Sequence, residues 1–175
     1  MTKHQTRQQM SIPWRVPVAI EDVSETGAHF QLVADAETRA AVARVAGLRG
    51  LPRLQANFDV RRYGAGGLRV VGDVSGTIEQ VCVVTLEPLV NEVAEQVDLL
   101  FVPQPAAPPD ANDKEAEPLI GGLIDLGALA TEFLILGLDP YPRKPGAVFH
   151  PPAQDAADAG PFAALAALKK GHDGH

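Results

Sequence analysis

The chain has 175 residues with 46% hydrophobic and 21% charged content, which is typical of one soluble globular domain with a proper core. No apolar run approaches the roughly eighteen residues of a membrane helix, and the polar start of the chain lacks the apolar centre of a secretory signal. We therefore expect a cytoplasmic protein. Its single cysteine, Cys82, excludes an internal disulfide.

The net charge of −7 is unevenly distributed along the chain. Residues 35–70 carry seven arginines against three acidic residues, whereas residues 71–140 carry thirteen acidic residues against one lysine. Such an asymmetry indicates a charged partner. The acidic part would suit a basic protein, and the arginine-rich part could contact phosphate. Two solvated faces that attract each other within the fold explain the pattern equally well.

Differences in composition give the expected domain organisation. Residues 1–12 are polar and are expected to form a disordered leader, and residues 13–150 are expected to form a single domain. Residues 151–175 are rich in Ala and Pro, which predicts a mostly disordered tail with one short amphipathic piece at 162–170.

The first part of the domain carries two short strand signals and a helix signal. Apolar residues alternate with others over residues 14–20, which predicts a strand, and Pro17 predicts an edge position for it. Alternation returns briefly at residues 30–34. Asp35 is then a suitable N-cap for an Ala- and Arg-rich helix of about residues 36–47.

The clearest β signal is a pair of alternating runs joined by a glycine-rich loop. Residues 54–61 alternate between apolar and polar, residues 64–67 turn the chain, and apolar residues return on even positions over 68–78. This pattern predicts an antiparallel hairpin. Gly72 and Gly76 fall at inward positions, which predicts bulges or a close neighbouring backbone.

After Ile78 the apolar phase changes, so the strand is expected to bulge or to end before the turn C-V-V-T-L-E-P at residues 82–88. A further strand carries its apolar residues at positions 89, 93, 97, 99 and 101. Residues 103–118 are rich in Pro and acidic residues and poor in apolar ones, which predicts a mobile loop.

The stretch 124–149 begins as a helix and ends as a stiff extended strip. Asp125 is a good N-cap and Gly137 a suitable C-cap. Apolar residues occur around much of this helix, so we expect burial on more than one side. One face is predicted to consist of Leu126, Leu129, Phe133 and Leu136. Three prolines then favour extended backbone that presents Tyr141, Arg143 and Lys144.

In order, these elements predict an α+β fold: an antiparallel β-meander or partly open barrel with two or three packed helices.

The turn and the last helix together resemble the YceD family, whose members are described as large ribosomal RNA subunit accumulation proteins. The resemblance runs from about residue 70 to residue 149. It implies a role in 23S rRNA accumulation and ribosome assembly, without an understood chemistry.

Two motifs carry this resemblance. The family turn reads roughly C-x-x-C-L-x-P; Cys82 and the run 86–88 match it, and Thr85 replaces the second cysteine. The family helix reads roughly I-D-L-x-x-L-x-x-E-x-L-x-L-x-L-P and is matched at Ile124, Asp125, Leu126, Leu129, Glu132, Leu134, Leu136 and Leu138. Many members add a cysteine-rich C-terminal knuckle, which this chain lacks. Its Y-P-R-K-P-G-A-x-F ending resembles the alphaproteobacterial branch.

Neither a metal centre nor an active site is expected. A structural zinc site needs four Cys or His ligands, usually in close pairs, whereas Cys82 has no partner cysteine and the five histidines are scattered. We therefore interpret Cys82 as a buried or half-buried thiol in a turn, flanked by valines that do not activate it. The glycines at 64–67 link two strands and do not form a phosphate loop. No cofactor is expected, and no enzymatic activity.

The best candidate for partner contact is the strip with Tyr141, Arg143 and Lys144, because its prolines reduce the entropy lost on binding. Packing of this strip on the sheet, with Tyr141 in the core, is the equally supported alternative. Glu132 is a carboxylate in an apolar helix. It lies on a solvated stripe, pairs with an arginine of this chain, or anchors a partner's Arg or Lys. Glu87 is interpreted as an exposed residue of the turn, next to Pro88.

Direct RNA binding through the segment from Arg39 to Arg69 is the alternative, with Arg53, Arg61 and Arg62 as its candidate residues. Aromatic residues for base stacking are few there, and about three phosphate contacts give a salt slope of only roughly −2. The leading hypothesis is therefore a non-enzymatic assembly factor that binds a basic ribosomal protein or a pre-ribosomal large-subunit particle. We expect no membrane contact, and the sequence does not specify the oligomeric state.

Overall fold

The structure is a computed structural model that describes residues 13–103 and 116–149. The expected leader at 1–12, most of the expected loop at 103–118 and the tail at 151–175 lie outside these described residues. The elements in chain order are β1 (Pro17–Ala19), the 3-10 helix η1 (Ile20–Asp22), β2 (Ala28–Val33), α1 (Ala36–Val45), β3 (Gly50–Tyr63), β4 (Gly67–Val81), β5 (Pro88–Pro103), β6 (Glu117–Leu119), β7 (Leu123–Asp125) and α2 (Leu126–Leu136).

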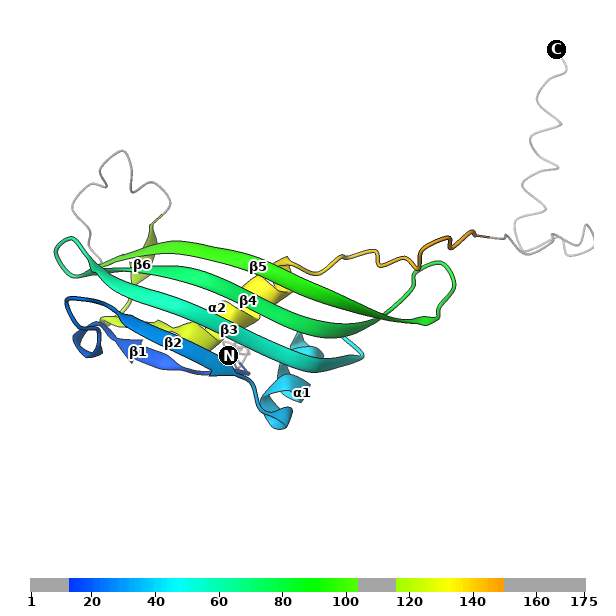
Figure 1. The fold of residues 1–175 in the computed structure, drawn as a ribbon, viewed down its shortest axis with the longest axis horizontal. Coiled ribbons are helices and arrows are strands. Elements are labelled where there is room, and N and C mark those ends of the chain that lie inside the picture. Colours follow the sequence, from blue (N-terminus) through cyan, green and yellow to red (C-terminus); the bar gives the residue numbers. More distant parts are fainter. Residues whose placement is uncertain (1–12, 104–115, 150–175) are drawn as a thin grey trace, which may run out of the picture.

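A five-stranded sheet in the order β2-β3-β4-β5-β6 dominates the described part of the chain. Strands β2 to β5 form an antiparallel meander, and β6 adds to β5 in parallel. A second, two-stranded sheet pairs β1 with β7. Figure 1 shows α2 behind the large sheet, so none of the described helices covers the opposite face. The predicted α+β class and meander are confirmed, and the sheets do not close into a barrel.

The predicted hairpin is the centre of this meander. The side chains of Phe58, Val60, Leu68 and Val70 are fully buried on one face, and the register of β3 with β4 is continuous from Arg53 to Tyr63. The inward glycines therefore mark close approach and not bulges. A Cβ atom on Gly76 would lie 3.0 Å from the Arg53 carbonyl oxygen and 3.1 Å from a methyl carbon of Leu134 on α2.

Some predicted element boundaries were wrong. The first strand is shorter than residues 14–20, because the chain turns at η1, where the Ile20 N–H donates to the Gly122 carbonyl over 2.9 Å. The 103–118 loop was predicted too long: residue 103 still belongs to β5, and residues 117 and 118 belong to β6. Strands pair through their backbone N–H and C=O groups. The three-residue strand β6 therefore forms without the apolar alternation that would have predicted it.

Helix α2 is held at its start by one carboxylate oxygen. Asp125 Oδ1 accepts from the backbone N–H groups of Gly127 and Ala128, each over 3.1 Å, and from Val16 over 2.9 Å. The predicted N-cap is confirmed, and it also fastens the segment before β1 to the helix. Gly137 is the C-cap, as predicted, with helical backbone angles.

The buried surface of α2 is wide, as predicted, because the helix lies between the large sheet and the segment around β1. Leu126, Ala130 and Leu134 are buried. Gly127 is also buried. A larger residue does not fit there, because a Cβ atom on Gly127 would lie 2.7 Å from the Trp14 carbonyl oxygen. Leu136 lies on the predicted face with Leu129 and Phe133 but is 68% exposed, so burial on that face does not reach the end of the helix.

We predict that Leu134→Ala lowers the free energy of unfolding by about 2–5 kcal/mol, because it leaves a cavity in a fully buried site. Chemical denaturation measures this loss. The matched control is Leu136→Ala, the same substitution two residues away, which should cost less than about 0.5 kcal/mol. Equal losses for the two variants would contradict the packing described for α2.

Candidate partner-binding surface

The turn between β4 and β5 is a tight loop closed by its own backbone. The Cys82 N–H donates to the Glu87 carbonyl, and the Leu86 N–H donates to the Cys82 carbonyl, both over 2.9 Å. Leu86 has a φ angle of 59°, the left-handed conformation that is uncommon for a residue with a side chain. Its side chain is 75% exposed at the tip of the turn.

Cys82 lies at the centre of this turn and is fully buried, as predicted for a turn thiol. Its sulfur accepts the backbone N–H groups of Thr85 over 3.4 Å and of Lys144 over 3.3 Å. A hydrogen bond from the Thr85 side chain and then the backbone N–H groups of Lys144 and Thr85 lower the pKa of Cys82 to about 7. The apolar side chains of the flanking valines do not set the pKa of the thiol, because its donors are Thr85, in the same turn, and Lys144, far along the chain.

Residues 139–149, here called the strip, are fastened to this turn along their backbone. The Val83 N–H donates to the Pro142 carbonyl over 2.9 Å, and the side chain of Gln80 donates to the Asp139 carbonyl over 3.1 Å. The Asp139 carboxylate in turn accepts the Tyr141 N–H over 2.8 Å. Pro142 is buried. The strip therefore has a defined backbone conformation before any partner arrives.

Two of the predicted partner-binding residues bind each other. The Lys144 ammonium lies 2.9 Å from a carboxylate oxygen of Glu87, and both side chains are about half exposed. Hydrogen bonds from the Lys144 and Thr85 side chains hold the pKa of Glu87 below its usual value. An exposed pair of this kind stabilises by at most about 1 kcal/mol, so its main effect is to fix where the strip lies.

Tyr141 and Arg143 are presented outward by the docked strip. The Tyr141 side chain is 70% exposed, so the alternative that placed it in the core is excluded. Arg143 is exposed and makes no side-chain hydrogen bond or ion pair within the described part of the chain. Around them are further exposed apolar side chains that the sequence patterns did not single out: Val83, Leu86, Val148 and Phe149.

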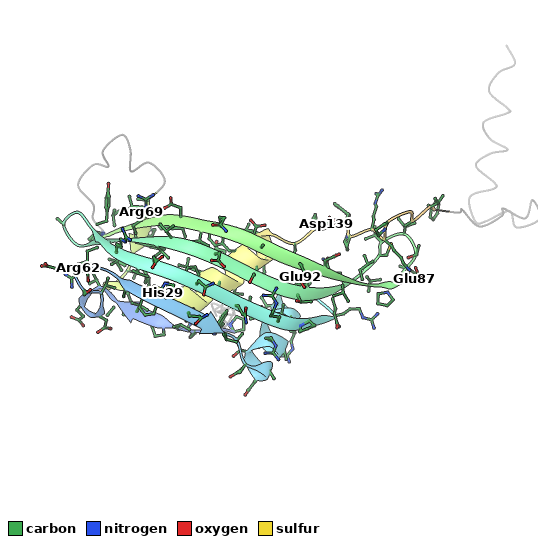
Figure 2. All side chains as sticks on the ribbon, viewed as in Figure 1. His29, Arg62, Arg69, Glu87, Glu92 and Asp139 are labelled. Carbon is green, nitrogen blue, oxygen red and sulfur yellow. The ribbon has the colours of Figure 1, made fainter. Side chains whose placement is uncertain are left out.

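The two acidic residues predicted to contact a partner, Glu132 and Glu87, lie at separate places. Glu132 is exposed on α2 and makes no side-chain hydrogen bond within the described residues. Glu95, on β5, lies beside the end of the same helix, where its carboxylate oxygen is 2.6 Å from the position of a Cβ on Gly137. Figure 2 shows Glu87 near the tip of the turn, with Asp139 toward the same end of the sheet.

The arginines proposed for RNA do not form one basic face. Arg61 and Arg62 are neighbours on β3 and point to opposite sides of the sheet. The Arg62 guanidinium donates to the Val23 carbonyl over 2.7 Å and holds the loop after η1. Arg53 is paired with Glu92 over 2.6 Å. Arg61 has no side-chain partner among the described residues and lies across the strands from Arg69, which is paired with Asp98. Figure 2 shows Arg62 and Arg69 at the end of the sheet away from Glu87.

No three side chains of His, Cys, Asp or Glu gather among the described residues as the ligands of a metal ion would. None of the described helices has the length and apolar character to span a membrane.

Comparison with known proteins identifies the family. The sequence model of the family described as "Large ribosomal RNA subunit accumulation protein YceD" matches residues 70–169. This match covers more than half of the 175 residues and includes most of β4, the turn, α2 and the strip. The chain belongs to the YceD family. No curated protein and no solved structure matched it.

Membership of the YceD family confirms the resemblance inferred from the turn and helix motifs. The family is described by the accumulation of the RNA of the large ribosomal subunit and not by a chemical reaction. The two motifs also form one structural unit here, because the strip that follows α2 docks on the turn that contains Cys82.

The lowered pKa of Cys82 predicts how the stability of the folded chain depends on pH. The pKa of Cys82 is about 7 in the folded chain against an ordinary value of 9.0, so between these values the unfolded chain binds more protons. The free energy of unfolding should therefore rise as pH increases from 7 to 9, and this gain should be lost as pH falls through 7. Denaturation at a series of pH values measures the slope.

The control is Cys82→Ala, which has no thiol to titrate and should lack the Cys82 contribution to this slope. Ultraviolet absorbance of the thiolate in the folded protein gives the pKa directly. A thiol that stays protonated up to pH 9 would show that the two backbone N–H groups do not hold the sulfur as described.

Proposed function

We propose that this protein is a non-enzymatic factor that supports 23S rRNA accumulation by binding an assembly intermediate of the large ribosomal subunit in the cytoplasm. The contact surface is the strip and the turn on which it docks. Tyr141 and Arg143 are its central residues, and the partner is a basic ribosomal protein or a ribonucleoprotein particle that contains one.

The main support for this function is the exposed side chain of Tyr141 on a backbone that hydrogen bonds hold in place. Tyr141 is 70% exposed, while the backbone on both sides of it is fixed by hydrogen bonds to Asp139 and Val83. Tyr and Arg are the residue types that most often dominate binding energy in interfaces. A backbone that is already ordered loses little conformational entropy when a partner binds.

The acidic contact for a basic partner comes from a carboxylate on α2 that is unpaired among the described residues. Glu92 and Asp98 on the open face of the sheet are neutralised by Arg53 and Arg69. Glu132 has no such partner within the described residues. We therefore propose Glu132, on the helix that precedes the strip, as an acidic contact, whereas Glu87 and Lys144 mainly position the strip through their own ion pair.

Direct RNA binding through Arg53, Arg61 and Arg62 ranks second among our proposals. Arg53 and Arg62 already bind groups within the fold, and releasing them would cost those contacts. Arg61 is the member of the three that is available to phosphate without such a loss.

The test compares variants of the full chain in growing cells, scored by co-sedimentation with precursors of the large subunit on a density gradient. We predict that Tyr141→Ala with Arg143→Gln reduces association roughly tenfold or more, as expected for central interface residues. The matched control is Ile120→Ala with Arg15→Gln, an equally exposed apolar residue and an arginine without a side-chain partner in the described structure.

A third variant, Arg61→Glu, separates the two proposals. If it alone abolishes association while the strip variant remains bound, direct RNA contact replaces binding through the strip. If the wild-type protein does not associate with large-subunit precursors at all, the assembly role is wrong.

A further inference from the structure

A second surface with a different chemistry lies between α1 and the start of β3. It is an open groove of about 540 Å³, lined by residues of α1 and by the segment that leads into the strand. Its floor consists of small aliphatic side chains, among them Ala40, Ala43 and Leu51. The groove exists because α1 presents alanines here, which leave unfilled the space that larger side chains would occupy.

The walls of the groove are fixed by backbone hydrogen bonds. Helix α1 ends in a tight turn in which Gly47 has a φ angle of 67°, and the Leu48 N–H donates to the Ala43 carbonyl over 2.9 Å. The Arg49 N–H then donates to the Glu79 carbonyl over 2.9 Å, which joins this turn to the end of β4. The groove is therefore formed by the fold itself.

Arginines line the groove, and none of the lining residues is acidic. Arg39 is anchored, because its guanidinium donates to the Ala34 carbonyl over 2.7 Å. Arg44 and Arg49 are exposed and make no side-chain hydrogen bond or ion pair with any described residue. Asp35 and Glu37 lie at the opposite end of α1 from Arg44. One carboxylate, that of Glu79 on β4, lies directly against Gly50 of the lining, so the two unpaired arginines outnumber the acidic side chain described there.

We propose that this groove binds an acidic segment of a partner protein, in which aliphatic side chains alternate with Asp or Glu. Aliphatic side chains would fill the alanine-lined floor, and the carboxylates would pair with Arg44 and Arg49, whose guanidinium groups have no partner among the described residues. RNA fits less well. Its phosphates could pair with the arginines, but the floor offers no aromatic ring on which a base could stack and no polar group to read it.

The groove and the strip lie toward the same end of the large sheet. The Arg49 N–H donates to the Glu79 carbonyl, and the side chain of the neighbouring Gln80 donates to the Asp139 carbonyl of the strip. A partner that binds the strip is therefore within reach of the groove as well. Binding in the groove does not depend on the function proposed for the strip. It uses other residues, and its ligand is acidic, whereas the partner proposed for the strip is basic.

The test uses the full-length protein and a fluorescent twelve-residue peptide in which Leu alternates with Asp and Glu. Binding is measured by fluorescence anisotropy, and backbone amide shifts locate it on the protein. We expect shifts confined to α1 and residues 46–52. Replacing both exposed arginines, Arg44→Gln with Arg49→Gln, should weaken binding about tenfold or more.

Two matched variants isolate the groove. Arg15→Gln with Arg61→Gln removes the same charge from arginines elsewhere that also lack side-chain partners in the described structure, and should change affinity less than about twofold. Ala40→Phe keeps every charge but fills the groove, and should weaken binding as much as the loss of both arginines. Tyr141→Ala should leave peptide binding unchanged, so failure here and failure of the strip proposal remain distinguishable.

Control ligands decide what the groove recognises. A peptide with Ser in place of Leu and a twelve-nucleotide oligouridine should both bind at least about fivefold more weakly than the Leu peptide. Equal or tighter binding of either one would overturn the proposal in favour of a general anion surface or an RNA site. Absence of peptide binding, or equal losses in the two arginine variants, would also overturn it.

Discussion

The contact between the strip and the turn determines what the functional end of this protein looks like. The sulfur of Cys82 accepts the N–H of Lys144, 62 residues later in the chain, and the Val83 N–H donates to the Pro142 carbonyl. These bonds hold a segment that has few apolar side chains of its own in the core. Without them, Tyr141 and Arg143 would lie on a freely moving chain, and any partner would have to order that chain on binding. The ion pair between Lys144 and Glu87 adds little energy but selects one position of the strip.

The rest of the fold supports this contact. The long strands β4 and β5 carry the turn, and β5 alone has 16 residues, which corresponds to roughly 50 Å of extended chain. Helix α2 is packed against the same strands, with Gly76 allowing Leu134 to approach the sheet closely. The strip starts where α2 ends, so the position of the helix determines where the strip begins. Membership of the YceD family places these elements together in the matched region, within a family described by ribosomal RNA accumulation.

Local patterns predicted local structure well, and long-range contacts poorly. Alternation identified the hairpin because one face of the sheet is buried and the other is not, and Asp125 was recognised as a cap because its bonds run to the next few residues. Nothing in the sequence near Arg62 indicates that it binds the carbonyl of Val23, and nothing near Cys82 indicates that Lys144 donates to its sulfur. The pairing of Glu87 with Lys144 was missed for the same reason, although both residues had been singled out. The left-handed conformation of Leu86 has no residue-type signal, since glycine or asparagine is usual there.

Amide hydrogen exchange of the full-length protein, followed residue by residue by NMR, tests the central contact most directly. We expect the Val83 and Lys144 amides to exchange roughly a hundredfold or more slowly than in an unstructured chain, because both are hydrogen-bonded between the turn and the strip. The amide of Arg143, an exposed residue whose N–H makes no hydrogen bond with the described residues, serves as the internal comparison. If Val83 and Lys144 exchange as fast as Arg143, the strip is not docked, and Tyr141 is not held in place for a partner.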